Sequence, residues 1–162
     1  MVYAVAKDYP SKFALSPHAS DVEANFKKGL VSLPMGMENG APIEKLSDVA
    51  YFHQRGIRYV TLTHSRDNQI CDSSYDTLHT HHGLSDYGRA VVREMNRVGI
   101  MVDVSHLSDE AISDVLKVAA KPLIATHSGC RFFSPGFERN LPDSFIVAIA
   151  KTGGVIQVPF SM

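Results

Sequence analysis

Four acidic or histidine side chains lie at corresponding places in the sequence, each at the end of a short run of strand-forming residues. The runs MGME, YVTLTH, MVDVSH and PLIATH end at Glu38, His64, His106 and His127, respectively. Carboxylate and imidazole groups bind metals and transfer protons, so their recurrence at successive strand ends indicates a metal-binding or catalytic site. A single histidine at one strand end would instead be typical of a hydrogen-bonded structural residue.

Two histidines and a glutamate form the ligand set of a catalytic zinc ion that keeps an open position for water. We therefore predict that Glu38, His106 and His127 bind zinc. Bound zinc brings the pKa of its water to about 7, which makes hydroxide available at neutral pH. For His64, two roles stay open, a further ligand or a catalytic hydrogen-bond donor.

The side chains of a strand alternate between its two faces, which places His106 on the face of Val102 and Val104. If that face points into a barrel, the imidazoles converge above an apolar plug. Asp103 belongs to the opposite face. We expect it to be buried beneath helices and paired with a basic residue.

Short apolar runs alternate along the chain with amphipathic segments. The runs predict strands over Lys12–Ser16, Leu30–Glu38, Arg58–His64, Ile100–His106, Pro122–Ser128 and Val155–Ser161. Stripes of helical period predict helices over Leu46–His53, Val91–Val98, Ile112–Ala119 and Phe145–Ala150, with a shorter one over Asp21–Lys28. Serines suited to cap helix N-termini are Ser20, Ser85 and Ser108, and glycines follow several of the predicted helices.

Strands that alternate with helices predict an α/β protein with a parallel sheet. Two architectures fit, the open doubly wound sheet and the (β/α)8 TIM barrel. The sequence has no G-x-G-x-x-G or Walker motif, so the doubly wound sheet loses its usual nucleotide-binding function. A barrel places catalytic side chains at the carboxyl ends of several strands, and this favours the barrel.

The composition narrows the classes of partner. With 162 residues, 44% hydrophobic content and a net charge of -1, the chain predicts one globular core and no nucleic-acid partner. No apolar run reaches the roughly 20 residues that span a bilayer, and the N-terminus lacks the apolar core of a signal peptide. A cytoplasmic location is expected only if the chain is complete as written, and otherwise the localisation stays open. Cys71 and Cys130 are predicted to be free thiols.

The other histidines give little indication of a functional site. His79, His81 and His82 of LHTHHGL are expected in a solvated loop, with adventitious metal binding as the alternative. His53 completes a helix stripe and is expected to pack there.

At its strand-end blocks the sequence resembles the membrane dipeptidase, or renal dipeptidase, family of zinc peptidases. The matching stretches are GMENG, RYVTLTH, GLSDYGRAVVREMNRVGIMVDVSHLSD, PLIATHS, RNLPD and KTGGVIQVPF. The likeness runs from about Pro10 to the end, with the blocks in the family's order. It implies a (β/α)8 barrel with two zinc ions that hydrolyses dipeptides through a metal-bridging water.

The resemblance also implies roles for single residues. Glu38 would bridge both zinc ions, and His106 and His127 would complete the shell of one of them. His64 looks like the histidine that stabilises the tetrahedral intermediate, and Arg139 resembles the arginine that binds the terminal carboxylate of the substrate. Without the resemblance, Arg139 alone would indicate a solvated loop charge.

The sequence also departs from the family pattern. The family's H-x-D motif of the first strand is absent, and the chain ends before the family's aspartate of the last strand. A complete barrel needs about 250 residues. We therefore expect residues 1–162 to form a single partial barrel domain with strands two to seven, one intact zinc site and exposed sheet edges.

Three functions fit these observations. The first is a zinc dipeptidase, or the central part of one, whose substrate is a small dipeptide. The second is an inactive remnant that binds one metal or forms homo-oligomers through its exposed sheet edges. The third is another metal-dependent barrel amidohydrolase, acting for example on a cyclic amide or a lactam.

Overall fold

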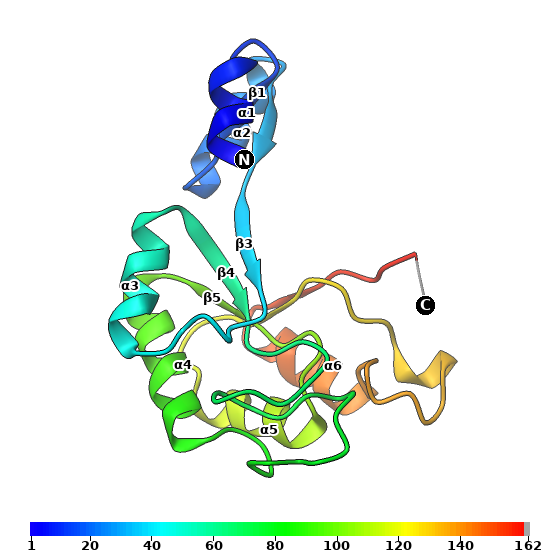
Figure 1. Cartoon of the computed structure of the whole chain (residues 1–162). Coiled ribbons are helices and arrows are strands. Elements are labelled where there is room, and N and C mark those ends of the chain that lie inside the picture. Colours follow the sequence, from blue (N-terminus) through cyan, green and yellow to red (C-terminus); the bar gives the residue numbers. More distant parts are fainter. Residues whose placement is uncertain (161–162) are drawn as a thin grey trace.

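The computed structural model describes residues 1–160 and is dominated by a five-stranded parallel sheet (Figure 1). Its strands follow one another in chain order, and they are β3 (Met35–Glu38), β4 (Ile57–Thr61), β5 (Met101–Asp103), β6 (Ile124–Ala125) and β7 (Val155–Ile156). A helix lies between each pair of consecutive strands: α3 (Leu46–Gln54), α4 (Asp86–Val98), α5 (Asp109–Val118) and α6 (Asp143–Lys151). This succession is that of a (β/α)8 barrel, here incomplete, with edges at β3 and β7.

The N-terminal part, residues 1–33, projects beyond the start of β3 (Figure 1). It contains α1 (Val2–Asp8), β1 (Phe13–Leu15), α2 (Ala19–Lys27) and β2 (Val31–Leu33), and β1 and β2 pair only with each other. The single strand predicted over Leu30–Glu38 is therefore wrong. Pro34 separates β2 from β3, and proline has no N–H group to continue a ladder. No pattern in the sequence predicted α1.

The predicted helices are confirmed to within a few residues, whereas the predicted strands are too long. β4 ends three residues before His64, β5 three before His106, and β6 two before His127. These histidines therefore lie in the loops that follow the strands. Of the strand predicted over Val155–Ser161, β7 covers the start and Ser161 lies outside the described residues. None of the helices found in residues 1–160 is long and apolar enough to cross a membrane.

Local capping contacts fix where the helices begin. The side chains of Ser85 and Ser108 accept hydrogen bonds from the backbone of their first turns, as predicted. Ser20 is not a cap, because α2 already begins after His18, whose backbone N–H donates to Asp21. The glycines predicted to follow helices all have positive φ.

The hydrophobic core lies between the five-stranded sheet and its helices. Val60, Val102 and Val104 are buried there together with Val91 and Met95 of α4. The opposite face of the sheet borders a hollow of about 430 Å³, lined among others by Tyr59, Met101, Ile124, Thr126 and Val155. The apolar face expected to form a plug inside the barrel therefore packs against the helices instead. Asp103 and Thr61 lie on the opposite face of the sheet, the one that borders the hollow.

Gly88, in the first turn of α4, brings the start of that helix against the preceding loop. A Cβ atom at this position would clash with the carbonyl group of Ile70. Although alanine favours helix more than glycine does, we predict that Gly88→Ala lowers the free energy of unfolding by about 1–3 kcal/mol, because backbone cannot move aside as a side chain can. Urea unfolding followed by circular dichroism measures this change.

The exposed helix residue Ser47 offers the matched control. Ser47→Ala should change the free energy of unfolding by no more than about 0.5 kcal/mol. Equal or greater stability of Gly88→Ala would contradict the packing argument.

Candidate metal centre

Three of the predicted site residues meet at the carboxyl end of the sheet. Oε1 of Glu38 lies 3.0 Å from Nε2 of His106 and 2.9 Å from Nε2 of His127. The two Nε2 atoms are 2.8 Å apart. One oxygen and two nitrogens, contributed by β3 and by the loops after β5 and β6, thus form a compact triangle.

This triangle fits a bound metal ion. Ligand atoms that share one tetrahedral zinc ion lie about 3.4 Å apart, given bond lengths of about 2.0–2.1 Å. The sides of 2.8 to 3.0 Å observed here are slightly shorter. Two imidazole lone pairs this close repel each other unless a proton or a cation lies between them. Glutamate and histidine are also the donor types that zinc prefers.

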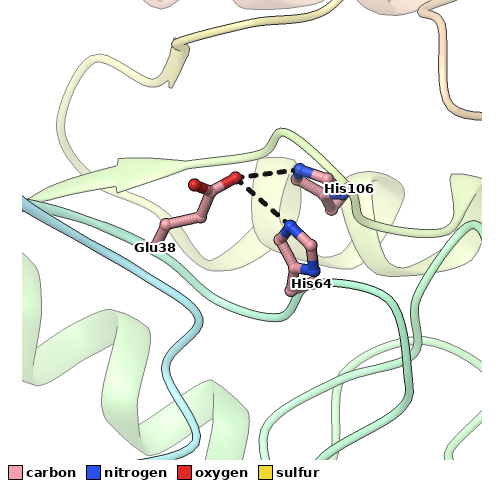
Figure 2. Close-up of side chains that lie close together, drawn as sticks. All are labelled: Glu38, His64 and His106. Carbon is pink, nitrogen blue, oxygen red and sulfur yellow. Dashed lines mark hydrogen bonds and ion pairs between the residues drawn. The ribbon is translucent and has the colours of Figure 1, made fainter.

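His64 lies beside Glu38 and His106, and its ring points toward the Glu38 carboxylate (Figure 2). Its Nε2 is 3.5 Å from Oε1 of Glu38, and its ring centroid is 4.2 Å from that of His106. One ligand atom each of Glu38, His64 and His106 lies within 4.8 Å of the others. On the far side of the ring, Nδ1 of His64 lies 2.7 Å from the hydroxyl oxygen of Ser65. The position of His64 is compatible with both roles left open by the sequence.

The backbone of His106 has an unusual conformation. Its φ is +70°, in the left-handed region that histidine rarely adopts, and its carbonyl group accepts a hydrogen bond from Ser74. The ring is buried, and its Nδ1 has no hydrogen-bond partner among the described residues. Burial lowers the pKa of His106 to about 4, and the nearby Arg139 acts in the same direction. The imidazole is therefore neutral at physiological pH, which is the form that binds metals.

Asp103 lies beneath the triangle and is fully buried. Its Oδ2 accepts hydrogen bonds of 2.6 Å from the hydroxyl groups of Thr61 and Thr126. Its Oδ1 accepts from the backbone N–H groups of Ser105 and Thr126, both at 3.0 Å. The expected basic partner is thus replaced by hydroxyl and amide donors. Thr126 was not predicted from the sequence, where its one signal is its position directly before His127.

Arg139 is buried rather than solvated, with 8% of its surface exposed. Its Nη1 donates to the hydroxyl group of Ser128 at 2.8 Å, and its Nη2 donates to the carbonyl group of His127 at 2.6 Å. Burial lowers the pKa of Arg139 from its usual value. Arg139 also lines a pocket of about 550 Å³ that reaches the candidate ligands, with walls that include Tyr75, His106, His127, Phe133 and Phe137. Arg139 therefore lies beside the triangle of candidate ligand atoms.

The loop that carries Arg139 is anchored by a second arginine. Arg131 forms two hydrogen bonds of 2.7 Å with the carboxylate of Asp109, at the start of α5. It also donates to the carbonyl groups of Glu138 and Asn140. These contacts hold both ends of residues 131–140 on α5, which positions Arg139 between them.

The remaining histidines and the cysteines lie outside this cluster. His82 is exposed as predicted, but His79 and His81 are half-buried, and Nε2 of His81 lies 2.8 Å from the carbonyl oxygen of Asn68. Both cysteines are free, as predicted. Burial raises the pKa of Cys71, while Cys130 is only half-buried.

A model of the membrane dipeptidase family (peptidase family M19) matches residues 1–162. The chain belongs to this family. Dipeptidase tcpJ of Claviceps purpurea is 38% identical over 153 residues, and dipeptidase verJ of Clonostachys rogersoniana is 32% identical over 161 residues. These matches take in 94% and 99% of this chain, but only 36% and 41% of the two relatives.

Solved structures of the family agree with the fold. The probable dipeptidase PvdM from Pseudomonas aeruginosa is 29% identical with a TM-score of 0.93, over 97% of this chain and 41% of that one. A metallopeptidase from Rhodobacter sphaeroides, liganded with a phosphinate mimic of L-Ala-D-Ala, is 27% identical with a TM-score of 0.87. This match covers 99% of the present chain and 47% of the metallopeptidase. The chain is thus similar to dipeptidases and to a metallopeptidase, and it spans less than half of their length.

The anchor of the Arg139 loop can be tested without any ligand. Lysine cannot form the two parallel hydrogen bonds that Arg131 makes with Asp109. We predict that Arg131→Lys speeds amide hydrogen exchange in residues 129–142 and leaves exchange in β5 unchanged. Hydrogen-exchange mass spectrometry measures both regions.

Arg97 provides the matched control, since it pairs with Glu94 on the exposed side of α4. Arg97→Lys should leave exchange in residues 129–142 as it is in the original chain. If both variants protect this loop equally, Arg131 does not anchor it.

Proposed function

We propose that this chain carries a zinc site of a dipeptidase, in which Glu38, His106 and His127 hold the ion. The observation that carries this proposal is the mutual distance of 2.8 to 3.0 Å between one donor atom of each residue. Membership of the membrane dipeptidase family supports a peptide-hydrolysing role for the site.

When bound, zinc acts as a Lewis acid that polarises a carbonyl group and lowers the pKa of a water molecule. His64 is suited to stabilise the oxygen on which negative charge develops. Its Nδ1 lies 2.7 Å from the hydroxyl group of Ser65, which can donate to it. With Nδ1 as the acceptor, the proton of His64 is on Nε2, the nitrogen that faces Glu38 and the site.

Arg139 is suited to bind the terminal carboxylate of the substrate. Two of its five N–H groups donate within the chain, which leaves others on a guanidinium that lines the pocket beside His106 and His127. The pocket volume of about 550 Å³ is in the range of small-molecule sites. A dipeptide substrate is also supported by the Rhodobacter sphaeroides relative, which was solved with a dipeptide mimic.

Zinc binding tests the site directly. We predict that zinc raises the melting temperature of the chain, because a ligand that binds only the folded state stabilises it. Glu38→Gln, which removes the charge from the shared carboxylate, should abolish most of this shift. Thermal denaturation with increasing zinc, together with elemental mass spectrometry of the purified chain, measures the effect.

The exposed His82 provides a control, because asparagine tolerates the left-handed backbone found there. His82→Asn should retain the full zinc-dependent shift. If His82→Asn removes the shift and Glu38→Gln does not, zinc binds in the 79–82 loop and the proposed site is wrong.

Hydrolysis tests the function. The zinc-loaded chain should release amino acids from a panel of dipeptides, and we predict that His64→Ala lowers kcat by about 10²–10³, the usual cost of removing an oxyanion donor. Arg139→Lys should chiefly raise KM, since lysine cannot make a bidentate contact with a carboxylate. Zinc binding without hydrolysis of any dipeptide would contradict the proposed activity and favour a non-catalytic metal-binding role.

A further inference from the structure

We propose that Asp103 and Thr126 are positioning residues that hold the His127 ring with its proton on Nδ1 and its free Nε2 lone pair toward the metal. The inference rests on the proposed zinc site for its functional meaning. Its geometric basis is a continuous series of contacts, from the Asp103 carboxylate through the Thr126 hydroxyl group to the imidazole.

The direction of the hydrogen bonds follows from the number of protons available. The Thr126 hydroxyl oxygen lies 2.6 Å from Oδ2 of Asp103 and 2.8 Å from Nδ1 of His127, but a hydroxyl group has only one proton to donate. A carboxylate is the stronger acceptor, and the contact with Asp103 is the shorter of the two. Thr126 therefore donates to Asp103 and presents a lone pair to His127, so Nδ1 must carry the proton.

The carboxylate itself is held in place. Backbone N–H groups of Ser105 and Thr126 fix its Oδ1, and the Thr61 hydroxyl group donates to Oδ2 from the neighbouring strand. Asp103 is the acceptor in all four of its hydrogen bonds to Thr61, Ser105 and Thr126, and the residue is fully buried. It is an acceptor that can neither rotate nor be replaced by solvent, so the hydroxyl proton of Thr126 has one stable direction.

The three histidines of the site differ in how they are held. His106 is buried and fixed by its own left-handed backbone, and its Nδ1 has no partner in the described part of the chain. Nδ1 of His64 has the exposed hydroxyl group of Ser65 as its hydrogen-bond partner. His127, with 35% of its side chain exposed, is oriented through Thr126 and a buried carboxylate. Loss of this contact should therefore affect His127 selectively.

Two substitutions at position 126 separate positioning from packing. Thr126→Val keeps the shape and removes the hydroxyl group, whereas Thr126→Ser keeps the hydroxyl group. We expect Thr126→Val to weaken zinc binding by about 10–100-fold, the usual effect of losing the partner of a metal-binding histidine. Thr126→Ser should retain the original affinity. Competition with a chromogenic chelator measures the dissociation constant of each 162-residue chain.

A third variant reverses the polarity of the contacts. Asp103→Asn places an NH₂ group where Oδ2 lies, so this group donates to Thr126, and the Thr126 proton turns toward Nδ1 of His127. The ring proton must then occupy Nε2. Long-range ¹H–¹⁵N NMR distinguishes the two tautomers, and spectra of zinc-loaded and metal-free chains at about pH 8, where histidine is neutral, provide the readout.

The outcomes separate this inference from the proposed function. A proton on Nε2 of His127 in the original chain, or zinc affinity and a His127 tautomer unchanged in Thr126→Val, would overturn the inference. Zinc binding that fails in the original chain would overturn the proposed function alone, because the metal-free spectra still report the tautomer. If Asp103→Asn does not fold, the Thr126 pair decides the question.

Discussion

The buried carboxylate of Asp103 is the constraint on which the rest of the site depends. A charge removed from water without compensation destabilises a fold by several kcal/mol, so its oxygens must find donors. They find them in Thr61 at the end of β4, in Ser105 after β5 and in Thr126 after β6. The hydrogen bonds to this one charge thus fix the carboxyl ends of three neighbouring strands relative to one another, and the candidate ligands meet at these ends.

The sequence predicted those features that depend on local periodicity and residue chemistry. Helices α3 to α6 and the caps Ser85 and Ser108 follow from apolar spacing and from side chains that bond within one turn. The parallel α/β succession follows from their alternation with strands. The triangle of Glu38, His106 and His127 was also predicted, because the carboxyl ends of parallel strands meet at one edge of the sheet.

Other features depend on contacts between distant residues, and the sequence did not predict them. Strand alternation predicts that His106 continues the face of Val102 and Val104. However, β5 ends at Asp103, and the left-handed backbone at His106 then redirects the chain. The face that carries Val102 and Val104 therefore packs against helices, while the imidazole turns toward Glu38. The burial of Arg139 likewise depends on its contact with Ser128 and on a loop held by Arg131. No local sequence pattern predicts either contact.

The three proposed ligands are not held equally. His106 is fixed by backbone conformation and His127 by a buried carboxylate, but Glu38 ends an edge strand and leaves 48% of its side chain exposed. Within residues 1–160, β3 pairs only with β4. The register of this pair shifts between Met35 and Gly36, where the ring of Tyr59 lies so close that a side chain on Gly36 would clash. The position of the Glu38 carboxylate therefore depends on the pairing of β3 with β4. His106 and His127 are held in position by contacts in the interior of the fold. Glu38, on the edge strand β3, is the least firmly held of the three side chains, so it limits how precisely the site is positioned.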